Sequence, residues 1–341
     1  MTTDAFSKLD PRLAQMLAMM PPPHENDVSS RDELLERVST PEGRQMVEMM
    51  KVTMEALDSE ELAPSGCLRI TDEMITSAPD GNTIRLRVIR PDSDAVLPCV
   101  YYIHGGGMAS MSSDYGLYRT WGRLIANQNV VVVMVEFRNC EIPGAVPEVA
   151  PYPAGLNDCV AGLHWTVAHA AQHGIDPSRV IVAGESGGGN LTLATGMKLL
   201  RDGHIGAVSG LYAMCPYIAG EWPNPDLPST IENNGILLDL HHNRGRYGYG
   251  IEAFDAKDPL AWPLFATESD VAGLPRTTIV VNECDPLRDE GIAFLRLLHK
   301  AGVPARGEML LGTSHGAELM TVVVPDISIA RARSIAAFAA G

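Results

Sequence analysis

Two glycine-rich segments, residues 104–107 and 184–190, constrain the fold of this chain more than any other feature. Each follows a short apolar run, residues 99–103 and 180–183, of the kind that is typical of a buried strand. The second segment leads into a helical pattern over residues 191–200. Because glycine lets the backbone bend sharply and lets neighbouring chains approach closely, both segments indicate tight turns at the ends of strands.

Strand and helix patterns alternate along the chain after Cys67. The expected strands are residues 99–103, 130–136, 180–183, 208–213, 277–282 and 305–310. The expected helices are residues 118–127, 155–173, 186–201, 286–301 and 326–339. Continuous apolar strands separated by helices predict an α/β fold, with a mostly parallel central sheet flanked by helices. Residues 68–76 and 83–90 flank a Pro-Asp-Gly-Asn turn, which predicts a hairpin before this sheet.

Ser186 stands among the glycines of the second segment, at the predicted junction of strand and helix. A serine in such a turn has an exposed hydroxyl and forms a nucleophile elbow. The first glycine segment lies where its backbone N–H groups can stabilise the oxyanion of an acyl-transfer reaction. A serine flanked by glycines is a weak signal by itself, but the two segments together predict transfer of an acyl group to water.

A serine hydroxyl is a weak nucleophile until a base takes its proton, and that base needs an acid to orient it. With an elbow of this kind, the acid and then the base follow the serine along the chain. Asp285 stands directly after the expected strand 277–282, and His315 follows the expected strand 305–310. We therefore expect Ser186, Asp285 and His315 to form a catalytic triad. The competing acids are Glu283, Asp289 and Glu290, and the competing histidines are His241, His242 and His299.

Several neighbouring residues are expected to be structural. His104 should brace the glycine loop, and Glu185 should lie near the positive end of the following helix. The six cysteines lack CxxC or metal-site spacing, so we expect no metal ion and no cofactor. Several of them stand in apolar runs, where we expect buried reduced thiols. The six cysteines are Cys67, Cys99, Cys140, Cys159, Cys215 and Cys284.

With these motifs in place, the chain resembles the hormone-sensitive-lipase-like branch (family IV) of carboxylesterases. Besides the two glycine segments, the matching segments are residues 136–139, 152–158, 285–290 and 314–316. The resemblance runs from Cys99 to the C-terminus, and the helical start resembles the N-terminal cap of the family. Glycine after Ser186 is similar to the subgroup that contains heroin and brefeldin A esterases. Met108 departs from the family, which often has an aromatic residue at this position, and this puts the shape of the acyl or alcohol pocket in doubt.

The resemblance implies an α/β-hydrolase fold and a serine carboxylesterase that hydrolyses short- to medium-chain acyl esters. It implies that Ser186 attacks the ester carbonyl while His315, held by Asp285, accepts its proton. The oxyanion would be stabilised by the backbone N–H groups of Gly106, Gly107 and Gly187. The residues that would support these motifs are His104, Gly105, Gly184 and Gly188.

The chain is expected to carry two cap elements. Residues 1–62 are helical in pattern and rich in methionine, with Asp10 and either Ser29 or Ser30 as helix caps, and they predict an N-terminal helical cap segment. Residues 63–341 would form the catalytic domain. Within it, residues 216–262 break the strand–helix alternation and predict a cap insertion. Together the caps predict a covered pocket for small or medium acyl groups.

Charge and composition restrict the partners. A formal net charge of -16 argues against nucleic acid and against an anionic membrane surface. The sequence shows neither a secretory signal pattern nor an apolar run of transmembrane length, so we expect a cytoplasmic protein. The expected partner is a small-molecule ester, and the resemblance allows a homodimer through the sheet edge.

Other functions remain open on the sequence alone. The same triad would serve a lactone, amide or acetyl-sugar hydrolase. A non-catalytic binding protein, like the plant gibberellin receptors that the family resembles, is disfavoured because those receptors lack the catalytic histidine and His315 is present. An aspartate nucleophile, as in epoxide hydrolases, is excluded because the elbow carries Ser186.

Overall fold

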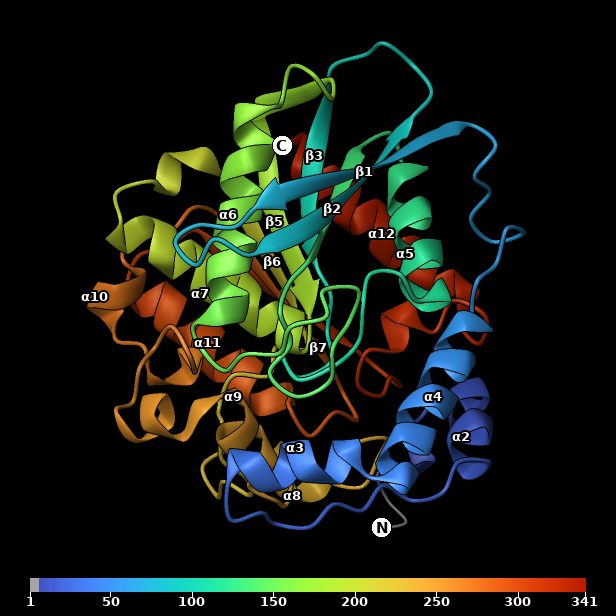
Figure 1. The fold of residues 1–341 in the computed structure, drawn as a ribbon, viewed down its shortest axis with the longest axis vertical. Coiled ribbons are helices and arrows are strands. Elements are labelled where there is room, and N and C mark those ends of the chain that lie inside the picture. The colour runs from blue at the N-terminus through green and yellow to red at the C-terminus, as the bar shows by residue number, and fades with distance from the viewer. Residues whose placement is uncertain (1–5) are drawn as a thin grey trace.

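An eight-stranded sheet forms the centre of the computed structural model, which describes residues 6–341 (Figure 1). The strands are β1 (Leu68–Thr76), β2 (Thr83–Pro91), β3 (Leu97–Ile103), β4 (Val131–Glu136), β5 (Ile175–Glu185), β6 (Gly210–Met214), β7 (Thr277–Asn282) and β8 (Ala305–Leu310). Their order across the sheet is β1-β2-β4-β3-β5-β6-β7-β8. The pairs β1–β2 and β2–β4 are antiparallel, and all other pairs are parallel. The predicted mostly parallel α/β sheet is therefore confirmed.

The strands in the middle of the sheet are covered on both faces. Every residue of β3, β4 and β7 is buried. Strands that present apolar side chains on both sides need helices on both sides of the sheet. The predicted hairpin is also present, with Thr76 paired to Thr83 across the turn between β1 and β2.

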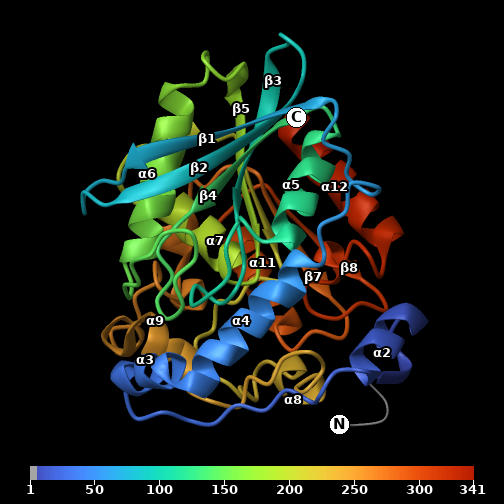
Figure 2. The same ribbon diagram turned by 45° about the vertical axis from the view of Figure 1, so that its right-hand side comes forward.

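Helices cover both faces of the sheet (Figures 1 and 2). On one face lie α5 (Gly116–Ala126) and α12 (Pro325–Ala340), whose Trp121 and Ile335 are buried in the same hydrophobic cluster. On the other face lie α6 (Ala154–Ala168), α7 (Gly187–Arg201) and α11 (Arg288–Lys300). Within residues 6–341, no helix is long and apolar enough to cross a bilayer.

The boundary between α6 and β5 differs from the prediction. The helix was expected to reach residue 173, but it ends at Ala168, because His169 leaves the helical conformation. Gly174 then adopts a positive φ of 60°, a conformation that favours glycine. This turn lets β5 begin at Ile175, where Ile175 pairs with Leu97 of β3.

The described part of the N-terminal segment includes three helices with side-chain caps. They are α2 (Pro11–Ala18), α3 (Arg31–Ser39) and α4 (Pro41–Glu55). Asp10 accepts a hydrogen bond from the backbone of Arg12, and Ser30 accepts one from the backbone of Glu33, as expected for helix caps. The remaining helical elements are α8 (Ser229–Glu232), α9 (Arg244–Asp255), α10 (Glu268–Val271) and three short 3₁₀ turns, η1 (Ile205–Ala207), η2 (Pro263–Phe265) and η3 (Ala317–Leu319).

The N-terminal helices and the insertion lie together beyond the carboxyl ends of the parallel strands (Figures 1 and 2). Asn243, at the start of α9, joins them: its side chain accepts from the Val28 backbone N–H at 2.8 Å and donates to the Val28 carbonyl at 2.9 Å. At the other end of the segment, Arg12 forms an ion pair of 2.6 Å with Asp326 of α12. Contacts with two other regions of the chain, the insertion and α12, thus hold the N-terminal segment in this position.

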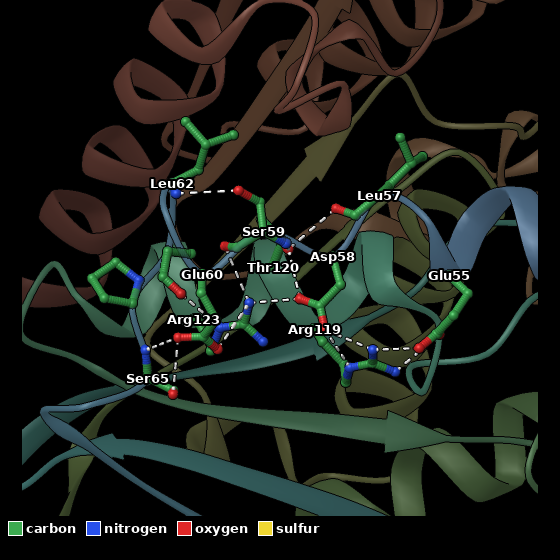
Figure 3. Close-up of polar contacts among 12 residues, drawn as sticks. Glu55, Leu57, Asp58, Ser59, Glu60, Leu62, Ser65, Arg119, Thr120 and Arg123 are labelled. Atoms are coloured by element: carbon green, nitrogen blue, oxygen red, sulfur yellow. Dashed lines mark hydrogen bonds and ion pairs between the residues drawn. The ribbon is translucent and has the colours of Figure 1, made fainter.

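A charged cluster connects the end of α4 to α5 (Figure 3). Asp58 lies 2.6 Å from Arg119 and 2.6 Å from Arg123, and Glu55 lies 2.6 Å from Arg119. The Arg123 side chain is only 5% exposed, and its Nε donates to the Ala63 carbonyl at 2.7 Å. Because a buried guanidinium needs compensation, Asp58 is the residue on which this connection depends.

Replacing Asp58 should destabilise the protein. Asp58→Ala removes the nearer carboxylate of the buried Arg123 and leaves only Glu60, at 3.6 Å, so we expect the free energy of unfolding to fall by about 2 kcal/mol. Asp94→Ala is the matched control, because Asp94 is fully exposed and its pair with Arg69 spans 3.5 Å. Urea unfolding of the three proteins measures the difference, and equal losses in the two variants would contradict the role given to Asp58.

Candidate active site

Ser186 lies in a sharp turn between β5 and α7. Its backbone has φ 56° and ψ -119°, a strained conformation for a residue other than glycine. The Ser186 N–H donates to the Met214 carbonyl at 2.9 Å, and its carbonyl accepts from the Tyr217 N–H at 3.1 Å. The predicted elbow is therefore present, and Ser186 is partly exposed while the residues on either side are buried.

Glycines are required where the two glycine segments meet. A Cβ atom on Gly184 would lie 2.5 Å from the carbonyl oxygen of Gly188, and a Cβ on Gly188 would collide with the carbonyl oxygen of Ile103. The end of β3 therefore packs backbone to backbone against the elbow. This packing brings the loop after β3 to the position of Ser186.

Three backbone N–H groups gather beside Ser186. Gly106 and Gly107 have positive φ values of 97° and 63°. Gly187 lies against them, because a Cβ on Gly187 would be 2.7 Å from the nitrogen of Gly107. Within residues 6–341, the N–H groups of Gly106, Gly107 and Gly187 donate to no other group. Converging N–H groups of this kind favour a negatively charged oxygen.

A buried carboxylate holds the glycine loop. Glu185 accepts hydrogen bonds from the Gly105 N–H and the Tyr118 hydroxyl, both at 2.6 Å, and from the Tyr102 hydroxyl. Glu185 directly precedes Ser186, the N-cap of α7, and these hydrogen bonds connect its side chain to β3, to the loop after β3 and to α5. Burial raises the pKa of Glu185 from its ordinary value of 4.5 to about 7, although the three donors oppose the shift.

His104 braces the same loop, as expected. Its Nδ1 lies 2.8 Å from the Gly105 carbonyl oxygen, and its ring stacks on Phe137 with centroids 4.3 Å apart. Burial lowers the pKa of His104, which favours the neutral imidazole. A neutral ring that is packed and hydrogen-bonded in this way is structural.

Asp285 and His315 are in contact at the end of β7. The Asp285 Oδ2 lies 2.8 Å from the His315 Nδ1, and Asp285 is fully buried. The other oxygen of Asp285 accepts from the Leu287 N–H at 2.8 Å, which fixes the carboxylate. Burial lowers the pKa of His315, but the Asp285 carboxylate and the neighbouring Cys215 outweigh it, so this pKa lies well above its ordinary value of 6.5.

The competing acids and histidines have other partners. Asp289 accepts from the Ser229 N–H at 2.7 Å. Glu290 is buried and accepts from the backbone N–H groups of Ile218 at 2.7 Å and Ala219 at 2.5 Å, so it anchors the start of the insertion. Each remaining candidate pairs with backbone: Glu283 with Gly312, His241 with Thr230, His242 with Arg244 and His299 with Ala305.

Sequence reasoning missed Cys215 as a neighbour of the triad. Its thiol sulfur, a ring nitrogen of His315 and a carboxylate oxygen of Asp285 all lie within 4.8 Å of one another. These three side chains are also the group of possible metal ligands found within residues 6–341. The Ser186 hydroxyl forms no hydrogen bond with another described residue, so the structure does not join it directly to His315.

The buried Glu185 predicts a pH dependence of stability. Its folded-state pKa of about 7 lies above the ordinary 4.5, so the folded state binds this proton more tightly than the unfolded state. The contribution is fully present below pH 4.5 and is lost as pH rises toward 7. Between about pH 5 and pH 8, wild type should lose about 2 kcal/mol of stability relative to Glu185→Gln.

Urea unfolding at the two pH values measures this difference. The exposed Glu42→Gln is the control, and we expect its stability relative to wild type to be the same at both pH values. A constant difference between wild type and Glu185→Gln would contradict the raised pKa.

The chain matches known proteins over most of its length. A family model described as alpha/beta hydrolase fold matches residues 100–319. Carboxylesterase NlhH of Mycobacterium tuberculosis is 34% identical over 244 residues, which is 71% of this chain and 73% of that protein. Among solved structures, esterase Est22 with p-nitrophenol has a TM-score of 0.96 at 56% identity, covering 98% of both chains.

Brefeldin A esterase, described as a bacterial homologue of human hormone sensitive lipase, has a TM-score of 0.86 at 34% identity and covers 97% of this chain and 93% of its own. These relatives agree with the chain both in sequence and along the whole fold, and they indicate the same family. The chain belongs to the α/β-hydrolase fold family, and within it to the hormone-sensitive-lipase-like carboxylesterases.

Proposed function

We propose that this carboxylesterase hydrolyses short- to medium-chain acyl esters through an acyl-enzyme formed on Ser186. The observation that carries the proposal is the 2.8 Å contact between His315 Nδ1 and Asp285. This contact orients the imidazole at the carboxyl ends of the strands, where the elbow also lies. An imidazole whose Nδ1–H donates to a carboxylate has its lone pair on Nε2. That lone pair is available to a serine hydroxyl.

In the first step, the Ser186 oxygen attacks the ester carbonyl while His315 Nε2 takes the hydroxyl proton. Rotation of the exposed hydroxyl brings it to His315, since catalytic hydrogen bonds often tighten only when substrate is bound. The carbonyl oxygen becomes an oxyanion, which the N–H groups of Gly106, Gly107 and Gly187 stabilise. Donors of this kind contribute about 3 kcal/mol each in the transition state.

The second half of the reaction reverses these roles. His315 gives its proton to the leaving alcohol, and the acyl group stays on Ser186 as an ester. Water then attacks the acyl carbonyl while His315 again takes a proton. Collapse of this intermediate releases the carboxylic acid and restores the Ser186 hydroxyl, so Asp285 keeps its charge throughout.

Aromatic side chains beside the oxyanion donors support an acyl group of limited length. The Tyr217 ring lies near Gly107, 3.9 Å from where a Cβ on Gly107 would be, and stacks on Trp222 with centroids 4.7 Å apart. Trp222 donates to the buried Glu290 at 3.1 Å, which holds this aromatic pair in place. With a cap built from residues 6–62 and 216–262, this aromatic pair favours short and medium acyl chains.

Two further features bear on the cellular compartment and the oligomeric state of the enzyme. None of the six cysteines forms a disulfide within residues 6–341, which supports a reducing compartment such as the cytoplasm. Met309 and Leu311 are exposed at the free edge formed by β8, which supports a homodimer through this edge.

Removing the nucleophile tests the proposal directly. Ser186→Ala should lower kcat on p-nitrophenyl esters at least about 10,000-fold, because no acyl-enzyme can form. Its thermal unfolding should resemble that of wild type. Across esters from acetate to palmitate, wild-type activity should peak at short or medium chains. Serine-independent hydrolysis would refute the mechanism, and a maximum at palmitate would refute the restricted pocket.

The raised pKa of His315 predicts the pH profile of the reaction. Only the imidazole with a free Nε2 can act as base, so kcat/KM should rise with pH at values above the ordinary 6.5. Asp285→Asn removes the carboxylate that raises this pKa. The rise should move to lower pH, and kcat should fall about 10,000-fold.

Profiles of kcat/KM from about pH 5 to pH 10 provide the measurement. Asp289→Asn is the matched control, because Asp289 is paired with Arg288 and does not face His315. In Asp289→Asn, kcat/KM should rise with pH over the same range as in wild type. A rise at the same pH in wild type and Asp285→Asn would contradict the role of Asp285.

A further inference from the structure

Three different potential metal ligands meet beside the elbow. The Cys215 sulfur, a ring nitrogen of His315 and a carboxylate oxygen of Asp285 lie within 4.8 Å of one another, and all three residues are buried. His315 and Asp285 have roles in the proposed reaction, whereas that reaction gives none to the thiol. The Cys215 thiol, a soft metal ligand, therefore lies close to His315 without a role in the reaction.

The backbone fixes the position of this thiol. Cys215 directly follows β6 and has a positive φ of 35°, which is uncommon outside glycine. Its N–H donates to the Val280 carbonyl of β7 at 2.7 Å. The preceding residue, Met214, accepts the N–H of Ser186. Because both neighbouring strands and the elbow hold this turn, the side chain of Cys215 is directed toward His315.

We propose that Cys215, His315 and Asp285 form a binding site for a borderline-soft divalent ion such as Zn²⁺, and that this ion inhibits the esterase. Thiolate, imidazole and carboxylate are the ligands that Zn²⁺ takes in proteins. Three protein ligands leave a fourth position for water, as in open zinc sites. Hard ions such as Mg²⁺ prefer all-oxygen sites and do not fit this donor set.

The ion can reach these ligands from the substrate side. Ser186 is partly exposed, and His315 keeps 7% of its surface accessible. Bonds of about 2.0–2.3 Å require ligand atoms to surround the ion closely. The three side chains start within 4.8 Å of one another, so side-chain rotation without a change of fold closes the site.

Inhibition follows from the protons and bonds at His315, and this part rests on the proposed function. The Cys215 S–H bond breaks, its proton goes to solvent, and a sulfur–zinc bond forms. If the ion binds Nδ1, it replaces the proton shared with Asp285, and that proton moves to Nε2. If the ion binds Nε2, it takes the lone pair directly. In both cases Nε2 can no longer accept the Ser186 proton.

Zinc titration of the esterase activity tests the inhibition. Wild type should be inhibited by ZnCl₂ and should recover when EDTA is added, while MgCl₂ should have no effect. In Cys215→Ala, the zinc concentration for half-inhibition should rise at least about tenfold, with each variant compared with its own metal-free rate. Cys67→Ala, which removes the exposed cysteine, should behave as wild type.

If Cys215→Ala does not fold, Cys215→Ser replaces it, because a hydroxyl fills the position but is a poor zinc ligand. Equal zinc sensitivity of wild type and the folded Cys215 variant would overturn the proposal. So would inhibition by Mg²⁺ as strong as that by Zn²⁺.

A measurement of metal binding tests the metal site independently of the proposed function. Co²⁺ added to Ser186→Ala should bind at one ion per chain and give a near-ultraviolet thiolate-to-cobalt absorption band. The band should be absent when Cys215→Ala is added to that variant. No band in Ser186→Ala would overturn the metal site. Residual turnover by Ser186→Ala would instead refute the nucleophile and leave the binding result intact.

Discussion

The carboxylate of Glu185 joins the two glycine segments on which the rest of the site depends. It belongs to the elbow, one residue before Ser186, yet it accepts a hydrogen bond from Gly105 in the loop after β3. Two tyrosines satisfy its other oxygen positions in a site closed to water. A buried charge with three donors resists displacement, so the serine and the N–H groups of the loop are held in one geometry.

A second buried carboxylate, that of Glu290, holds the start of the insertion beside the elbow. Glu290 lies on α11, one turn beyond Asp285, and accepts the backbone N–H groups at the start of the insertion together with the Trp222 indole. Tyr217 comes directly before those N–H groups and bonds to Ser186 through its backbone. Glu290 and the backbone of the elbow therefore hold the same short segment, which carries the stacked pair of Tyr217 and Trp222.

Sequence patterns predicted the features that depend on local order, such as the bounds of β7 and β8 and the contact of Asp285 with His315. They failed at the start of β5, where residues 175–179 have the composition of a turn. Ile175 nevertheless pairs with Leu97 of β3, and the register then shifts before pairing resumes at Val180. The partners of Glu185 come from β3 and α5, and no local pattern reveals such a contact. The positive φ that directs Cys215 toward His315 is likewise invisible in the sequence. The start of β5, the partners of Glu185 and the orientation of Cys215 all depend on long-range packing. The periodicity of a sequence carries no information about such packing.

The covalent intermediate on Ser186 is the central claim of this account, and mass spectrometry of the acid-quenched reaction tests it most directly. Wild type mixed with excess p-nitrophenyl acetate and quenched during turnover should carry one acetyl group, on the peptide that contains Ser186. His315→Ala, which lacks the base, should remain unmodified over the same interval. An acetyl group on another residue, or steady turnover with an unmodified Ser186 in samples quenched during the initial burst, would contradict the mechanism.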